Sequence, residues 1–252
     1  MPDHALAAYQ DAFGHALWDM YRGRGGDTVI ERDDGLTDAY NPGLYFKGAE
    51  AWPAIERRAV RLARGRVLDI GCGPGRVCLH IQAQRKKGLS AVGIDNSPLA
   101  IRTCRRRGVE DARAMSIDDV GPDMGVFDTI LMFGNNFGLM GSFAKARRLL
   151  RTFHRMTSPR GRIIAAGLDP YRTARHEHLT YHRRNRRRGR MSGQLRIRVW
   201  YKQFVTPWFD YLFVSKRELA RILRGTGWRV ARYIEARNAR KDPNYVAVIE
   251  KA

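Results

Sequence analysis

A short run of glycines between two apolar segments constrains this chain more than any other feature of its sequence. Residues 67–75 read Val-Leu-Asp-Ile-Gly-Cys-Gly-Pro-Gly, and Asp95 closes the apolar run that begins at Ala91. Because residues 76–82 have helical character, the order is strand, turn, helix, strand and carboxylate. Glycines lack a Cβ and let a ligand lie against the backbone, and a carboxylate in that place accepts hydrogen bonds from a ribose. The pattern predicts a site for a nucleoside-bearing cofactor.

Two details distinguish this turn from a dinucleotide site. Position 76 is Arg, so the glycines have the spacing G-x-G-x-G and the pattern G-x-G-x-x-G is absent. Asp69 precedes the first glycine, Gly71, by two residues. An anionic pyrophosphate gains nothing from a carboxylate there, whereas a cofactor with a cationic amino group does. A turn without a ligand would leave both carboxylates unexplained.

These residues resemble motif I of the class I S-adenosylmethionine-dependent methyltransferases. In that family the first acid holds the methionine end of the cofactor, and the second takes the ribose hydroxyls. The resemblance therefore implies S-adenosylmethionine as the cofactor. The residues it assigns to that cofactor are Asp69, Gly71, Cys72, Gly73, Gly75, Asp95, Asn96, Ser116, Ile117 and Phe133. Ser116 departs from the family, which usually has an acid there; Asp118 and Asp119 follow slightly late.

Strands and helices alternate from Arg66 to the end of the chain, which predicts an α/β protein around a largely parallel sheet. The expected strands are 66–70, 91–95, 112–115, 127–133, 161–167, 228–235 and 245–250, and the expected helices are 76–82, 98–107, 142–154 and 215–224. The resemblance covers roughly residues 50–170 and 215–252. It implies a Rossmann-like three-layer α/β/α sandwich with seven strands in the order 3-2-1-4-5-7-6, the seventh antiparallel.

Residues 1–64 are expected to form an N-terminal helical lid or cap, followed by a methyltransferase domain over residues 65–252. Helical spacing over 5–21 and 50–64 predicts two helices, and residues 27–49 between them read as irregular. These helices are expected either to cover the cofactor or to pack against the sheet.

An insert at residues 170–214 lengthens the connection after the fifth strand. It holds the basic run 181–190 and then a strict alternation of apolar and basic residues over 195–202. With a second strand at 209–214, this predicts an antiparallel ribbon with one apolar face and one basic, aromatic face. Three roles stay open: an anion-binding substrate cap, an RNA-binding surface with Trp200 or Trp208 stacking on a base, or a solvated surface.

The polar residues near the strand ends and in the insert are the candidates for contact with the acceptor. The substrate-binding candidates are Asn135, Asn136, Tyr171, Arg196, Arg198 and Trp200. His178, His182 and Tyr181 are candidates for a general base, because dense positive charge favours neutral imidazole. The spacing of His176, His178 and His182 fits no common zinc pattern, so no metal is expected.

Composition limits the remaining classes. The net charge of +21 implies attraction to anions, whether small or polymeric. No apolar run is long enough to span a membrane, Met1–His4 lacks the pattern of a secretory signal, and three cysteines without metal spacing favour reduced thiols. We therefore expect a cytoplasmic protein without membrane contact, and the sequence does not fix its oligomeric state.

The predicted function is S-adenosylmethionine-dependent methyl transfer to a small anionic acceptor, at nitrogen, oxygen, sulfur or carbon. One alternative is an RNA methyltransferase acting on tRNA or rRNA. Another is a cofactor-binding or nucleic-acid-binding protein that has lost transfer activity. Asp69 and the glycine spacing disfavour a nicotinamide dehydrogenase.

Overall fold

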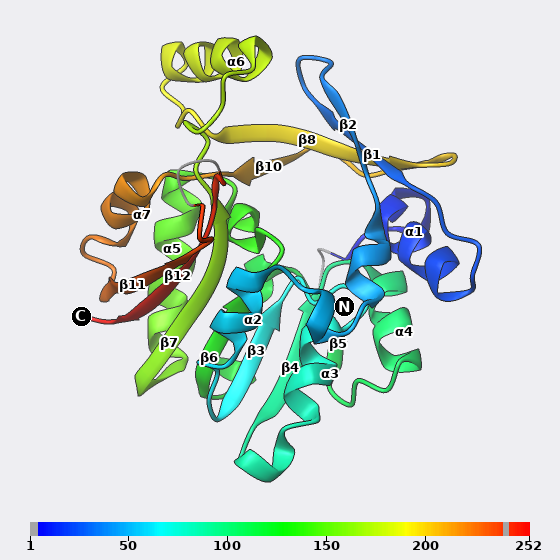
Figure 1. Cartoon of the computed structure of the whole chain (residues 1–252), viewed down its shortest axis with the longest axis vertical. Helices are drawn as coiled ribbons and strands as arrows, with labels where there is room; N and C mark the ends of the chain where they lie inside the picture. The colour runs from blue at the N-terminus through cyan, green and yellow to red at the C-terminus, as the bar shows by residue number, and fades with distance from the viewer. Residues whose placement is uncertain (1–4, 239–241) are drawn as a thin grey trace.

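The computed structural model describes residues 5–238 and 242–252, which form two β-sheets with their helices (Figure 1). The larger sheet contains β3 (Arg66–Ile70), β4 (Ser90–Asp95), β5 (Ala112–Ala114), β6 (Phe127–Met132), β7 (Thr157–Leu168), β11 (Trp228–Glu235) and β12 (Asn244–Lys251). Its order is β5-β4-β3-β6-β7-β12-β11, which is the predicted order 3-2-1-4-5-7-6. Strand β12 is antiparallel to both neighbours, and all other neighbouring pairs are parallel. The predicted fold class is confirmed.

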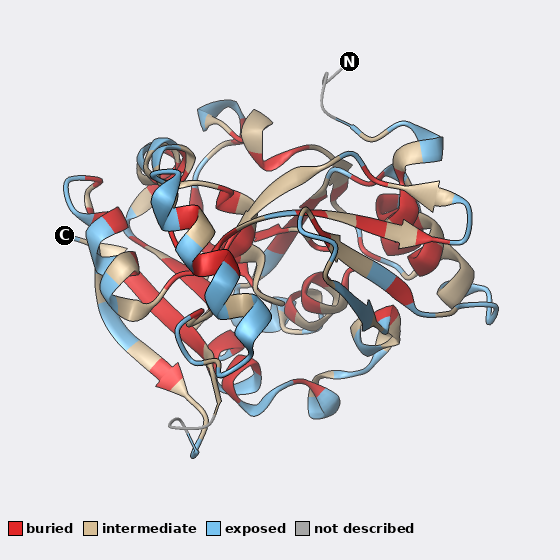
Figure 2. Cartoon of the chain, turned by 90° about the horizontal axis from the view of Figure 1, so that it is seen from above, coloured by how far each residue is buried: buried red, intermediate tan, exposed pale blue. Residues whose placement is uncertain are grey.

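Helices cover both faces of the larger sheet. They are α2 (Ala54–Val60), α3 (Arg76–Gln82), α4 (Pro98–Arg106), α5 (Phe143–Arg155) and α7 (Lys216–Leu223). Successive strand residues such as Ile130 and Leu131 point to opposite faces, so each enters a different hydrophobic cluster. One cluster includes α5 and α7 and the other α2, α3 and α4, which makes three layers. In Figure 2 most buried residues lie on strands, and the exposed residues lie on outer helices, loops and β2 (Thr37–Tyr40).

Short 3₁₀ helices fill several connections. They are η1 (Ala8–Gln10), η2 (Pro42–Phe46), η3 (Ala49–Ala51), η4 (Arg85–Lys87), η5 (Ile117–Asp119), η6 (Pro122–Met124) and η7 (Asn136–Met140). The N-terminal helix predicted over 5–21 is shorter, because Asp11 caps α1 (Ala12–Tyr21) by accepting a hydrogen bond from the Gly14 amide.

The second sheet lies across the top of the larger one in Figure 1. It consists of β1 (Thr28–Arg32), β2 (Thr37–Tyr40), β8 (Gln194–Tyr201), β9 (Phe204–Val205) and β10 (Phe209–Leu212). The path β10-β8-β1-β2 is antiparallel throughout, which confirms the predicted ribbon of the insert. The prediction that 27–49 is irregular is wrong: β1 pairs with β8, a partner too distant in sequence for local patterning to reveal.

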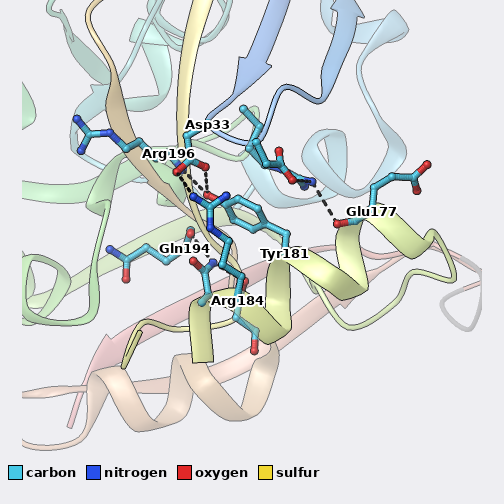
Figure 3. Close-up of polar contacts among 10 residues, drawn as sticks. Asp33, Glu177, Tyr181, Arg184, Gln194 and Arg196 are labelled. Carbon is cyan, nitrogen blue, oxygen red and sulfur yellow. Dashed lines mark hydrogen bonds and ion pairs between the residues drawn. The ribbon is translucent and has the colours of Figure 1, made fainter. Parts of the chain in front are cut away.

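The basic run of the insert forms helix α6 (His176–Arg187), which the sequence analysis did not predict. Tyr181 anchors this helix, because its hydroxyl donates to Asp33 at 2.6 Å and accepts the Arg196 amide at 3.2 Å. Figure 3 shows Tyr181 reaching from α6 towards Asp33, with Arg184 alongside at 3.7 Å from the same carboxylate. Arg32 adds a hydrogen bond of 3.2 Å to the Glu177 carbonyl. The helix is thus fastened to the turn between β1 and β2.

Within the described ranges, no helix combines the length and the apolar character needed to cross a membrane. The expectation that rested on Met1–His4 lies outside the described residues.

We predict that Tyr181→Phe lowers the free energy of unfolding by about 1–3 kcal/mol, because it deprives a part-buried carboxylate and an amide of their partner. Urea denaturation followed by circular dichroism measures this. Arg187→Ala, an exposed position on the same helix, is the matched control and should change stability little. Equal effects of the two substitutions would contradict the anchoring role of Tyr181.

Candidate active site

A cavity of about 1490 Å³ lies where the carboxyl ends of β3, β4, β6 and β7 meet the second sheet. Ligands in open α/β sheets bind at this edge, and ligand pockets commonly measure about 300–1,000 Å³. The cavity therefore has room for a cofactor and a second molecule.

The glycine turn after β3 is held in place by the neighbouring strand and by η7. The amides of Gly71 and Cys72 both donate to the Ile94 carbonyl at 2.9 Å. Gly71 has a φ of +72°, and a Cβ there would lie 2.4 Å from the Asn136 side-chain nitrogen. That nitrogen donates to the carbonyls of Ile70 and Gly71, at 2.9 Å each. Asn136, predicted to contact substrate, lines the cavity and also holds the turn.

Asp69 lines the cavity with only 3% of its surface exposed. Burial raises its pKa to about 7, against the opposing effects of the Cys78 thiol, which lies 3.5 Å away, and of the Arg76 charge. Neither Arg76 nor another cation forms an ion pair with this carboxylate among the described residues. A cationic group entering the cavity would relieve the desolvation of the ionised form.

Asp95 also lines the cavity, and each of its oxygens already accepts one backbone amide. Oδ2 accepts from Gly73 and Oδ1 from Ser97, both at 3.0 Å. Burial raises the pKa of this carboxyl to about 6, although the two hydrogen bonds oppose the shift. Since a carboxylate oxygen has more than one lone pair, both oxygens can still accept from a diol.

The N-terminal segment closes over this end of the site, which sequence reasoning did not reveal. The Leu6 amide donates to the Asn96 carbonyl at 3.1 Å. Asp11 accepts from the Ser97 hydroxyl at 2.9 Å and from the Leu99 amide at 3.1 Å. The only sequence signal was a helix nearby; its contact with the helix after β4 depends on the fold.

The other predicted cofactor residues are placed as follows. Cys72, Asn96, Ser116, Ile117 and Phe133 line the cavity. Gly75 does not; with a φ of +83° it starts α3. The Ser116 hydroxyl accepts the Asp118 amide at 3.2 Å, and Asp118 in turn pairs with Lys145 at 2.6 Å.

Only part of the predicted substrate set reaches the cavity. Asn135, Asn136 and Arg196 line it. Arg198 and Trp200 instead bind Glu31, at 2.7 and 2.6 Å, on the other face of β8. The Tyr171 hydroxyl donates to Glu218 at 2.8 Å outside the cavity.

Of the three general-base candidates, the two histidines line the cavity and Tyr181 does not. Burial lowers the pKa of His178, and the charges of Arg32 and Arg175 lower it further. Burial is also the main cause of the lowered pKa of His182, which is 5% exposed. Both shifts favour the neutral imidazole.

Two cavity residues that the sequence analysis did not single out form a buried ion pair. Glu56 of α2 and Arg76 of α3 are 2.7 Å apart. The second oxygen of Glu56 accepts the Gly134 amide, just after β6, at 2.8 Å. In the sequence, Arg76 stands out only because it breaks the dinucleotide pattern, and no local pattern indicates Glu56 as its partner.

Cys72, Cys78 and Cys104 are free and buried. Across residues 5–238 and 242–252, no group of three or more metal-ligating side chains is arranged to hold an ion.

Comparisons with known proteins agree on one family. A family model described as a methyltransferase domain matches residues 48–233. An S-adenosylmethionine-dependent methyltransferase from Bacteroides fragilis, solved with S-adenosyl-L-homocysteine, has a TM-score of 0.81 and 26% identity over 98% of each chain. No curated protein matches the sequence significantly.

Two further solved structures share the fold at lower identity. The CcbJ methyltransferase from Streptomyces caelestis has a TM-score of 0.63 and 14% identity, covering 96% of this chain and 99% of its own. An S-adenosylmethionine-dependent methyltransferase from Methanosarcina mazei has a TM-score of 0.58 and 17% identity, covering 79% and 98%.

We predict that the affinity for S-adenosyl-L-homocysteine falls as the pH drops through about 7, because protonation of Asp69 would remove the carboxylate that we expect to face the ligand's cationic amino group. Between pH 7 and about 6, below which Asp95 is protonated as well, the dissociation constant should rise up to tenfold per unit, as isothermal titration calorimetry can measure.

Asp69→Asn should bind weakly and lose most of this pH dependence, whereas Asp123→Asn, an exposed carboxyl, should behave like the unaltered protein. An affinity that stays flat on both sides of pH 7 would rule out this role for Asp69.

Proposed function

The chain belongs to the methyltransferase domain family, and on that premise we propose that it transfers the methyl group of S-adenosylmethionine to a small molecule held between its two sheets. When bound, the cofactor supplies a sulfonium methyl group to a nucleophilic atom of the acceptor, and S-adenosyl-L-homocysteine leaves with the electron pair of the broken bond. The protein's own residues then have to bind, orient and enclose the two molecules.

On this proposal Asp69 takes the cationic amino group of the cofactor and Asp95 takes the ribose hydroxyls. Burial supports the first role, because an ionised Asp69 has no cationic partner in direct contact among the residues that the structure describes. The amide contacts of Asp95 support the second, because they fix the carboxylate orientation. Ser116, Ile117 and Phe133 would enclose the adenine end.

The observation that carries a small-molecule acceptor is the apolar face of the second sheet above the strand ends. Antiparallel partners share a face, and the register pairs Ile30 with Val199 and Ile197 with Phe209. All four line the cavity, as does Tyr211. We propose that residues 1–64 and the insert 170–214, which supply these strands, act together as the cap over the acceptor.

The charges on the cavity wall favour an acceptor with an apolar, uncharged body. Arg196 lines the cavity without an ion pair among the described residues, whereas Arg32, Lys145 and Arg172 line it and each already has an acidic neighbour. These are Asp34 at 2.7 Å, Asp118 at 2.6 Å and Asp169 at 3.8 Å, respectively. An anionic acceptor stays a prediction from net charge, and it would have to compete with these carboxylates.

The candidates for proton transfer are His178, His182 and Tyr181. The Tyr181 hydroxyl is committed to Asp33 and Arg196, so we propose no role in the reaction for it. His178 and His182 line the cavity with the neutral imidazole favoured, and they stay candidates for a general base. Arg183, Arg186 and Arg187 of α6 are exposed, so RNA stays the alternative acceptor.

The proposal is tested with two ring probes that differ in charge, 2-naphthol and 2-naphthoate, titrated into the protein saturated with S-adenosyl-L-homocysteine at pH 7. We expect 2-naphthol to bind more tightly by roughly tenfold or more, which is about 1.4 kcal/mol. Tighter binding of 2-naphthoate would restore the anionic acceptor.

Ile197→Glu, on the cavity face, should weaken 2-naphthol binding, while Val29→Glu, on the opposite face of the same sheet, should not. Transfer of a labelled methyl group from S-adenosylmethionine to a panel of small acceptors, with tRNA as the comparison, then tests turnover. Transfer to tRNA alone would overturn the small-molecule proposal.

A further inference from the structure

The buried pair Glu56–Arg76 has no part in the functions assigned above. Its side chains are 5% and 9% exposed and come from α2 and α3, two elements that flank the cofactor turn. Desolvating two charges cancels much of their attraction, so a buried pair is weak evidence for stability alone. Its placement calls for another explanation.

Each partner makes a second contact on the acceptor side of the cavity. Glu56 accepts the Gly134 amide at 2.8 Å, where the chain leaves β6. The Arg76 guanidinium lies 4.9 Å from the Trp52 ring centre and 5.2 Å from that of Tyr45. Tyr45 and Gly134 both line the cavity. One ion pair therefore joins the cap, the cofactor turn and the loop after β6.

The same two charges act on Asp69. The groups that influence this carboxyl are Cys78 and Arg76 of α3, Asp95 of β4 and Glu56 of α2. Arg76 and the Cys78 hydrogen bond lower the pKa of Asp69, and Asp95 and Glu56 raise it. A change in the charge of Asp69 therefore also changes the electrostatic energy of Arg76.

We propose that the Glu56–Arg76 pair is a positioning device that couples cofactor binding at Asp69 to the acceptor side of the cavity at Gly134 and Tyr45. Before the cofactor binds, Arg76 is attracted electrostatically to two carboxylates, those of Asp69 and Glu56. A cationic amino group at Asp69 neutralises one of them. Arg76 is then attracted to Glu56 alone. This strengthens the hydrogen bond that Glu56 accepts from the Gly134 amide and the contact of Arg76 with the Tyr45 ring. This inference rests on the proposed function.

The first test is the pH at which S-adenosyl-L-homocysteine binding is half lost, measured by calorimetry. Glu56→Gln keeps an oxygen for Gly134 but removes the charge that raises the pKa of Asp69, so this pH should fall by roughly half a unit or more. Arg76→Gln removes the opposing charge, so this pH should rise by a similar amount. The two variants should shift the pH of half-lost binding in opposite directions. A purely structural defect would not reverse the sign of this shift between them.

The second test is hydrogen exchange with and without S-adenosyl-L-homocysteine. In the unaltered protein the ligand should protect residues 40–56 and 133–140 as well as the turn at 69–76. Arg76→Lys keeps the charge but loses the planar fork and the ring contacts. It should therefore bind with a nearly unchanged pH profile while protection at 40–56 and 133–140 is lost.

Arg85→Gln breaks an exposed ion pair with Glu110 and is the matched control, expected to leave both measurements unchanged. Shifts of the same sign in both Gln variants, or full ligand-induced protection in Arg76→Lys, would overturn the coupling. If Arg76→Gln does not fold, Glu56→Gln and Arg76→Lys still decide the matter. Failure of the unaltered protein to bind the ligand would instead overturn the proposed function.

Discussion

The site depends on the way the end of β4 holds the turn that follows β3. Two successive amides of the turn, from Gly71 and Cys72, share the Ile94 carbonyl, and the next glycine, Gly73, donates to the Asp95 carboxylate. These contacts require the two strands to be parallel neighbours in the register that sets Ile70 beside Ile94. They also require a residue without a Cβ at Gly93, where one would lie within 3 Å of the sulfurs of Cys72 and Cys78. Backbone pairing and close packing at Gly93 together fix the shape of the cradle.

This arrangement places two carboxyls in a dry, closely packed position, and that has a thermodynamic consequence. The pKa of Asp69 rises from its ordinary value of 3.8 to about 7 in the folded chain because of burial. Because the pKa of Asp69 is higher in the folded chain, the folded chain binds more protons than the unfolded chain between about pH 4 and 7. Asp69 therefore lowers the free energy of unfolding as the pH rises through this range. A cation bound at Asp69 reverses the effect. The buried carboxylate of the turn thus lowers the free energy of unfolding of the unliganded chain, and a cationic ligand restores it.

Features set by local sequence were predictable, and those set by distant pairing were not. Gly71, Gly73 and Asp95 stand out because turn chemistry and strand ends are local. The larger sheet follows from apolar runs such as 127–133, which need only their own periodicity to be recognised. By contrast, β1 becomes a strand because β8 pairs with it, and residues 176–187 become a helix because Tyr181 and Asn185 find buried partners. Glu56 and Arg76 meet only once α2 packs beside α3, so no spacing rule would have joined them.

Part of the positive charge of the basic insert is paired with acids elsewhere in the chain. Three arginines of the insert face three acids of residues 31–38: Arg198 meets Glu31, Arg184 meets Asp33 and Arg175 meets Asp38. Within the hairpin itself, Arg32 meets Asp34. The more exposed of these pairs contribute little to stability. They do neutralise charges that would otherwise act on a ligand beneath the sheet. An arginine-rich insert therefore predicts an anionic ligand only through the cations that the rest of the chain leaves unpaired, and here an acidic hairpin distant in sequence pairs with three of them.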